Sequence, residues 1–380
     1  MSIIIVDDQR ANVFVIEKIL QQAGYRDTVK LSSAQELFHY LHLQASTSEL
    51  SSIELILLDV MMPDIDGITA CRTLQESEIY KNIPIIFITA LEDVQKMAQA
   101  LDAGGVDYLT KPIDKMELLA RIRVALRLKS ELDWHAHQEK QLRNELELAT
   151  VVQRNVLSAP LQERNITIRA SYIPSSHLAG DMYYWQKIDE HRYGIILFDV
   201  MGHGVSASLV CMFMSSVLRE TIRTKVDPEL VITDLNRYIH MLHTEKDDIS
   251  YYLTAIYLVI DTHAKTVEYV NAGHPAGYMC RDRKSVVPLD TGCCALGFLP
   301  DILIQKTVLS FETVVQIMLV TDGVIEALDP LEQEAEKILQ GHCKPKWNDL
   351  DAELKSILSE EQKQEQTDDM CMVMIQAQTT

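Results

Sequence analysis

The sequence predicts two α/β domains of different architecture joined by a long helix. Residues 1–124 alternate short apolar runs with amphipathic stretches, which predicts a doubly wound domain with a parallel five-stranded sheet. Residues 125–158 contain neither Gly nor Pro and carry a helical repeat of apolar side chains. Residues 159–380 are rich in strand-like runs flanked by helical stretches, which predicts an αββα sandwich.

The composition limits the classes of function that need consideration. The 380 residues are 47% hydrophobic and carry a formal charge of −20, and an acidic chain is poorly suited to neutralising the phosphates of a nucleic acid. No apolar run approaches the length of a membrane-spanning helix, and the N-terminus is not a signal peptide. The seven cysteines lack zinc-type spacing. We expect a cytoplasmic protein that binds neither nucleic acid nor membrane.

In the first domain, reactive side chains follow the predicted strands. Apolar runs at residues 3–6, 55–58 and 85–88 are typical of buried parallel strands, and a short fifth strand passes through Tyr108. The groups at the strand ends are Asp7, Asp8, Asp59, Thr89 and Lys111. Each alone is an ordinary solvated residue, but three carboxylates at one sheet edge repel one another unless a cation joins them. With Mg²⁺ bound, one carboxylate can attack a phosphoryl group.

These residues, with Pro63, Gly67 and the Lys111-Pro112 pair, resemble the receiver domain of two-component response regulators. The resemblance implies that a histidine kinase phosphorylates Asp59. It assigns a Mg²⁺ site to Asp8, Asp59 and the Met61 carbonyl, with Asp7 assisting. It further implies that Thr89 and Lys111 hold phosphoryl oxygens, that Tyr108 turns inward on activation, and that the Lys111-Pro112 bond is cis.

The connecting segment carries apolar side chains at steps of four and three, the seam of a heptad repeat. The seam positions are Leu118, Ile122, Ala125, Leu128, Leu132, His135, Glu139, Leu142, Leu146 and Ala149. A helix of about 32 residues would be about 48 Å long. The pattern favours a parallel dimeric coiled coil, and the alternative is a single helix that packs on its own domains.

The second domain places five aspartates beside predicted strands. They are Asp181, Asp199, Asp322, Asp368 and Asp369. Predicted strands at 193–199, 251–261, 267–270, 316–320 and 370–375, with a helix over 205–223, account for most of this region, and a polar helical stretch is expected within 331–361. Carboxylates brought together by strand ends make a site for hard divalent cations. Two such cations can activate water and bind a phosphoryl oxygen.

The order Gly-Asp, Asp-Val-Met-Gly-His-Gly, Asn-Ala-Gly-His-Pro, Thr-Asp-Gly and Asp-Asp-Met resembles the type-2C metal-dependent serine/threonine phosphatases. Within that class it is similar to the bacterial branch that contains the stage II sporulation phosphatase and the stress-response phosphatases acting on anti-anti-sigma factors. The resemblance covers residues from about 145 onward. It implies two Mn²⁺ or Mg²⁺ ions and in-line attack by an activated water without a covalent phosphoenzyme.

The resemblance also implies a ligand set: Asp181, Asp199, the Val200 carbonyl, Asp322 and Asp368, with Asp369 as second choice for the last position. Cys371 replaces the threonine that usually follows Asp-Asp-Met, but no metal carboxylate is missing. Asn271 and His274 belong to a family motif or simply shape the turn before Pro275.

The combined expectation is a response regulator whose output is phosphatase activity. Its partners would be a histidine kinase, a phosphorylated anti-anti-sigma protein as substrate, and a second copy of the chain. The rival hypothesis is a non-catalytic adaptor gated by the receiver. Intact carboxylates favour the enzyme.

Overall fold

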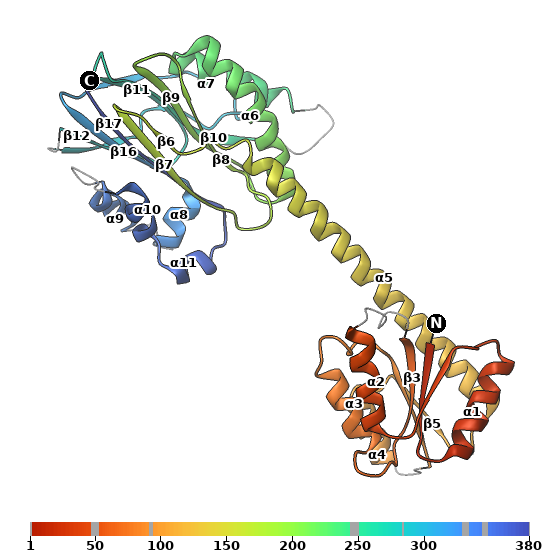
Figure 1. Cartoon of the computed structure of the whole chain (residues 1–380). Helices are drawn as coiled ribbons and strands as arrows, with labels where there is room; N and C mark the ends of the chain where they lie inside the picture. The colour runs from red at the N-terminus through yellow and green to blue at the C-terminus, as the bar shows by residue number, and fades with distance from the viewer. Residues whose placement is uncertain are drawn as a thin grey trace. The chain divides into compact units, whose positions relative to one another are not determined.

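The computed structural model describes residues 2–46, 53–90, 94–243, 251–282, 285–328, 334–343 and 349–379. The chain forms two compact units, Met1–Leu142 and Arg143–Thr380. Helix α5 (Lys115–Arg154) contributes its first part to one unit and its last part to the other (Figure 1). Each unit is described by itself below.

The first unit has the predicted doubly wound fold. Its strands are β1 (Ser2–Val6), β2 (Thr28–Leu31), β3 (Ile53–Asp59), β4 (Ile85–Thr89) and β5 (Asp107–Thr110). Its helices before α5 are α1 (Arg10–Gln22), α2 (Ala34–Ser46), α3 (Gly67–Gln75) and α4 (Val94–Asp102). The strands are parallel in the order β2-β1-β3-β4-β5. Because all run the same way, their carboxyl ends meet at one edge.

Alternating side chains of this parallel sheet build a core on each face. Side chains of β1 and β3 pack with α1 and α5 on one face, and with α2, α3 and α4 on the other. Such burial on both faces explains why the strands read as continuous apolar runs.

Helix α5 has 40 residues, more than the sequence pattern indicated. Its first seam residues, Leu118, Ile122 and Ala125, are at most 3% exposed and complete a core of the first unit. Farther along, Leu132 and Leu142 are 41% and 57% exposed. The heptad seam therefore divides into a part that packs within the first unit and a part that faces solvent in the single chain.

The second unit contains two six-stranded sheets. The first has the order β14-β11-β10-β9-β8, with β15 also on β11, and the second has the order β13-β12-β16-β17-β7-β6. The strands of the first are β8 (Asp181–Lys187), β9 (Arg192–Val200), β10 (Leu253–Asp261), β11 (Thr266–Ala272), β14 (Gly292–Cys293) and β15 (Thr307–Ser310). Those of the second are β6 (Leu161–Gln162), β7 (Ile166–Ile173), β12 (Gly277–Arg281), β13 (Ser285–Leu289), β16 (Val314–Val320) and β17 (Met370–Gln378).

Helices cover both outer faces, as the αββα prediction requires (Figure 1). Helices α6 (Val205–Lys225) and α7 (Pro228–His240) pack on the first sheet. Helices α8 (Asp322–Leu328), α9 (Ala335–His342) and α10 (Leu350–Ile357) pack on the second, and α11 (Glu360–Gln364) follows. Between the sheets lies a core that includes Trp185, Leu197 and Ile256.

Three expectations need correction in detail. The strand predicted from residue 251 begins at Leu253. The polar stretch within 331–361 forms three short helices. Residues 331–333 and 344–348 of this stretch are outside the described residues. Helix α6 is, among the described residues, the one helix long and apolar enough to cross a membrane, which corrects the expectation that no apolar run approaches that length. Half of that stretch is buried inside the domain, because α6 packs on the sheet.

Candidate functional sites

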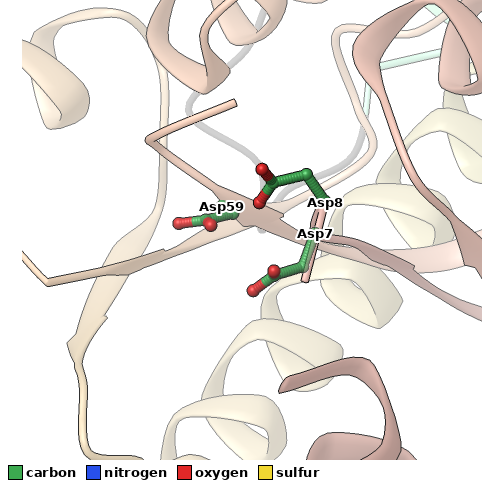
Figure 2. Close-up of side chains that lie close together, drawn as sticks. All are labelled: Asp7, Asp8 and Asp59. Atoms are coloured by element: carbon green, nitrogen blue, oxygen red, sulfur yellow. The ribbon is translucent and has the colours of Figure 1, made fainter. Parts of the chain in front are cut away.

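Three carboxylates meet at the carboxyl edge of the parallel sheet in the first unit. Asp7 and Asp8 follow β1 and Asp59 ends β3, and one oxygen from each lies within 4.8 Å of the others (Figure 2). Asp7 and Asp59 are each 2% exposed, whereas Asp8 is exposed. Because buried like charges repel, this arrangement suits a divalent cation reached from the Asp8 side.

Lys111 joins the two buried carboxylates of this group. Its Nζ lies 2.9 Å from Asp59 Oδ2 and 3.0 Å from Asp7 Oδ2. Burial raises the pKa of Asp59, the hydrogen bond from Lys111 opposes that rise, and nearby Asp7 adds to it. Burial also opposes the charge on Lys111, but its bonds to Asp59 and Asp7 raise its pKa overall. The ammonium therefore stays charged beside the proposed acceptor oxygen.

Neighbouring groups hold this geometry in place. The Asn12 amide donates to both oxygens of Asp7 at 3.1 and 3.0 Å, and nothing in the sequence pattern had singled it out. The amide nitrogen of Lys111 donates to the Thr89 carbonyl at 2.7 Å, and Thr89 is 2% exposed. The Lys111-Pro112 bond is cis, as predicted. Tyr108 is half-buried, with the Arg121 guanidinium 5.7 Å from its ring centroid.

In the second unit, Asp181 and Asp199 stand opposite each other on the antiparallel strands β8 and β9. Along a strand, side chains alternate between the two faces of the sheet. Asp181 is on the same face of β8 as Trp185, and Asp199 is on the same face of β9 as Leu197, so both aspartates face the space between the sheets. From the other sheet, the Thr321 hydroxyl donates to Asp181 Oδ2 at 2.7 Å. The site therefore lies at one end of the sandwich, where strand ends of both sheets supply polar groups.

Electrostatics link the remaining aspartates to this pair. Burial, followed by the charges of Asp322 and Asp368, raises the pKa of Asp199 to about 8. Burial and the charge of Asp199 raise the pKa of Asp181 well above its usual range, against the Thr321 hydrogen bond. Carboxylates that destabilise one another when ionised are the donor set that hard divalent cations occupy. The residues present thus fit the metal ions that the resemblance implies.

The five aspartates of the second unit are less tightly grouped than the three carboxylates of the first. Among the described residues, no three of them offer ligand oxygens that all lie within 4.8 Å of one another. Gly323 lets the Asp322 turn come close to the start of β17, because a Cβ at this position would lie 2.2 Å from the Asp369 carbonyl oxygen. The Val200 carbonyl approaches Gly180, where a Cβ would lie only 2.9 Å from it.

The structure separates the roles of Asp368 and Asp369. Asp369 is 3% exposed and accepts three hydrogen bonds, from the Ser175 amide at 2.7 Å, its hydroxyl at 2.8 Å and the Gly180 amide at 2.8 Å. Burial raises the pKa of Asp368, the amide of Asp369 opposes the rise, and Asp322 adds to it. Asp369 therefore ties down the loop before Asp181, whereas the charges of Asp368 and Asp322 interact.

The same loop is held from the other side by the end of α5. The Gln153 amide donates to the Ala179 carbonyl at 2.7 Å and its oxygen accepts from the Ala179 amide at 3.1 Å. The Thr150 hydroxyl donates to the His177 carbonyl at 2.6 Å. Gln153 is 4% exposed, so its two bonds to Ala179 are shielded from water. Gln153 lies in the segment predicted to form the connecting helix, but that pattern does not reveal its bonds to Ala179.

Asn271 shapes a turn, one of the two roles considered for it. Its amide donates to the carbonyls of His274 and Leu289 at 2.9 and 3.0 Å, and its oxygen accepts from the His274 amide at 2.8 Å. Cys371 is fully buried, and its amide donates to the Thr321 hydroxyl at 2.9 Å. The hydroxyl that holds Asp181 is thus supplied by Thr321, a residue that sequence reasoning did not select.

The fold and the two sites define a response-regulator receiver domain joined to a type-2C-like phosphatase domain. Residues 3–123 match the response regulator receiver domain family. Residues 189–378, half of the chain, match the family of Stage II sporulation protein E (SpoIIE), and the chain belongs to that family.

Individual relatives agree with this division. The phosphoserine phosphatase RsbP of Bacillus subtilis is 34% identical over 235 residues, which are 61% of this chain and 58% of RsbP. The transcriptional regulator RpaA of a Synechocystis strain is 38% identical over 125 residues, 33% of this chain and 48% of RpaA. The chain thus spans about half the length of these curated relatives. The SiaA-PP2C domain of Pseudomonas aeruginosa has the same fold, with a TM-score of 0.53, 19% identity and coverage of 64% of this chain and all of that domain.

Proposed function

We propose that this protein is a metal-dependent protein-serine/threonine phosphatase whose activity is controlled by phosphorylation of Asp59 in its receiver domain. One observation carries the catalytic part. Aspartates from strand ends of both sheets raise one another's pKa at one end of the sandwich, and Asp199 reaches about 8. Such a group is poorly explained as a stabilising element of the fold, because its charges repel.

In this proposal, Asp181, Asp199, the Val200 carbonyl, Asp322 and Asp368 hold two Mn²⁺ or Mg²⁺ ions. The bound ions would supply an activated water and neutralise charge on the phosphoryl oxygens. The chain's own contribution is to hold the carboxylates in place, and the bound cations would favour their ionised form. Thr321 holds Asp181 by a 2.7 Å bond, and Asp369 positions the loop before Asp181 as a supporting residue.

In the receiver, Asp59 would accept the phosphoryl group from a histidine kinase. Asp8, Asp59 and the Met61 carbonyl would hold Mg²⁺ there, and Lys111 and Thr89 would bind phosphoryl oxygens. The 2.9 Å contact between Lys111 and Asp59 supports this assignment, because the Lys111 ammonium could also pair with the negative charge of a phosphoryl group on Asp59.

Helix α5 is the proposed connection between input and output. Its start completes the receiver core, and its end bonds through Gln153 to the loop that leads into Asp181. Displacement or fraying of that end would move the loop. The exposed Leu132 and Leu142 support a parallel dimeric coiled coil, which sedimentation of the full chain would test.

The proposed substrate is a phosphoserine or phosphothreonine on a small anti-anti-sigma protein, so that hydrolysis releases a sigma factor from its inhibitor. The similarity to RsbP, a phosphoserine phosphatase, supports the choice of reaction. A cytoplasmic location is part of the same proposal.

The decisive experiment is hydrolysis of a phosphorylated anti-anti-sigma protein by the full chain with Mn²⁺. Wild-type protein should release phosphate, and Asp199→Ala should reduce the rate by at least about 100-fold, because a metal ligand is lost. Asp301→Ala, at an exposed site, serves as the control. Unchanged turnover in Asp199→Ala would refute the proposed site. Lack of metal-dependent turnover in well-folded wild-type protein, also with p-nitrophenyl phosphate, would favour the adaptor.

A further inference from the structure

A row of polar side chains continues beyond the two aspartates of the first sheet. Asp181 on β8 pairs with Asp199 on β9, and Asp199 pairs in turn with Thr254 on β10. Directly opposed residues of antiparallel strands project to the same face, with Cβ atoms about 4.5–5.5 Å apart. Ile256, two residues after Thr254, belongs to the core between the sheets, so Thr254 faces the same interior as Asp199.

Thr254 is joined to His274, which lies just beyond the end of β11. A hydrogen bond of 2.8 Å links the Thr254 hydroxyl oxygen to His274 Nδ1. The imidazole is 6% exposed, and the Asn271 turn fixes its backbone. Gly273 in that turn has φ of +68°, and a Cβ there would lie 2.8 Å from the Ala295 amide nitrogen. The ring therefore has one well-determined position.

His274 also lies next to the strand end that leads to Asp322. Burial lowers the pKa of His274 to about 3, and the Val320 carbonyl acts in the opposite direction, so the ring is neutral and close to the end of β16. Its Nε2 is buried and makes no hydrogen bond of normal geometry with any described group. The turn held by Asn271 could form without an imidazole at residue 274. The buried ring nitrogen of His274 therefore needs another explanation.

We propose that Thr254 and His274 are a positioning pair for the metal centre, in which His274 orients the Thr254 hydroxyl beside Asp199 and spaces the strand ends that carry Asp199 and Asp322. The inference rests on the proposed phosphatase function. Neither residue is a ligand in this proposal. Their effect is on metal affinity, because the groups around a metal ligand hold it in its binding orientation.

The test measures Mn²⁺ binding to the metal-stripped full chain by calorimetry, without substrate. Thr254→Val keeps the shape but removes the hydroxyl, and we expect affinity to fall about 10-fold. Thr254→Ser should restore it. His274→Leu should weaken binding to a similar extent, and the double variant no further, because the two residues act as one unit. Thr167→Val, at a half-buried position on β7, is the matched control.

A purely structural role predicts a different result. Thr254→Val that binds Mn²⁺ like wild type, or additive losses in the double variant, would overturn the proposal. If His274→Leu fails to fold, His274→Gln supplies the same comparison. Hydrolysis of p-nitrophenyl phosphate is measured in parallel, with the Mn²⁺ requirement expected to rise more than the maximal rate falls. Wild-type protein that binds Mn²⁺ but hydrolyses nothing would refute the phosphatase function and leave this test intact.

Discussion

At the scale of single residues, Asp368 and Asp369 show how neighbours in the chain can have unrelated tasks. Both carboxylates were plausible terminal ligands from the sequence. Besides burial, the charges of both raise the pKa of Asp199, so the two are distinguished by their hydrogen bonds. Asp369 faces inward, where it accepts three bonds from Ser175 and Gly180.

This division predicts opposite effects of two matched substitutions. Asp369→Asn should lower the free energy of unfolding of the phosphatase domain by about 1–3 kcal/mol, because one buried N–H donor loses its acceptor. Asp368→Asn should leave stability nearly unchanged and weaken Mn²⁺ binding by at least about 10-fold. Chemical denaturation and calorimetry measure the two quantities. If Asp369→Asn abolishes metal binding while Asp368→Asn does not, the assignment is reversed.

The raised pKa of Asp199 predicts how the metal-free protein responds to pH. In the folded state the pKa is raised to about 8 from an ordinary value of 3.8, so folding favours the protonated form. The resulting stabilisation is complete below about pH 4 and is lost as pH rises toward 8. In chelator, the phosphatase domain's unfolding temperature should fall over this range, and Mn²⁺ should raise it most near pH 8. A pH-independent effect of Mn²⁺ would contradict the charge-repulsion account.

At the scale of secondary structure, α5 performs different tasks along its length. Its first turns belong to the receiver core through Leu118 and Ile122, and its last turns present Thr150 and Gln153 to the loop before Asp181. A helix propagates a displacement along its axis because each turn is hydrogen-bonded to the next. The regulatory signal would therefore end at the two bonds between Gln153 and Ala179.

Breaking those two bonds should uncouple the helix from the loop. Gln153→Leu keeps the side-chain volume but leaves the Ala179 N–H and C=O without partners, which would loosen the ligand loop. We expect the Mn²⁺ concentration for half-maximal hydrolysis to rise about 10-fold. Gln141→Leu, at an exposed position on the same helix, is the control. Equal metal requirements in both variants would show that the Gln153 bonds do not position Asp181.

At the scale of the whole molecule, the two clusters of carboxylates are proposed to have different chemical roles. In the receiver, Asp59 is proposed to form an acyl phosphate, and in the phosphatase, the aspartates are proposed only to hold metal ions. Both clusters contribute to the charge of −20, which bound cations would partly offset. In the proposed function, communication between the two clusters controls the phosphatase activity.

Replacement of the acceptor tests that communication. Asp59→Ala should make the ratio of hydrolysis rates with and without acetyl phosphate equal to one, because no acyl phosphate can form. Wild-type protein should show a ratio that differs from one. Incorporation of radiolabelled phosphate checks the chemistry directly. A variant that is still stimulated would place the acceptor elsewhere.

The sequence by itself determined both fold classes and most of the candidate site. Continuous apolar runs specify buried parallel strands, and the residues directly after them must then meet at one sheet edge, which is how Asp7, Asp59 and Lys111 could be selected. Only the tertiary structure decided which groups support those residues. Asn12, Gln153 and Thr321 make their bonds across elements, Gln153 and Thr321 over 26 and 140 residues of sequence. Hydrophobic periodicity predicts which side chains are buried but not which polar groups bond to one another. Such bonds are therefore seen only once the strands and helices are packed together.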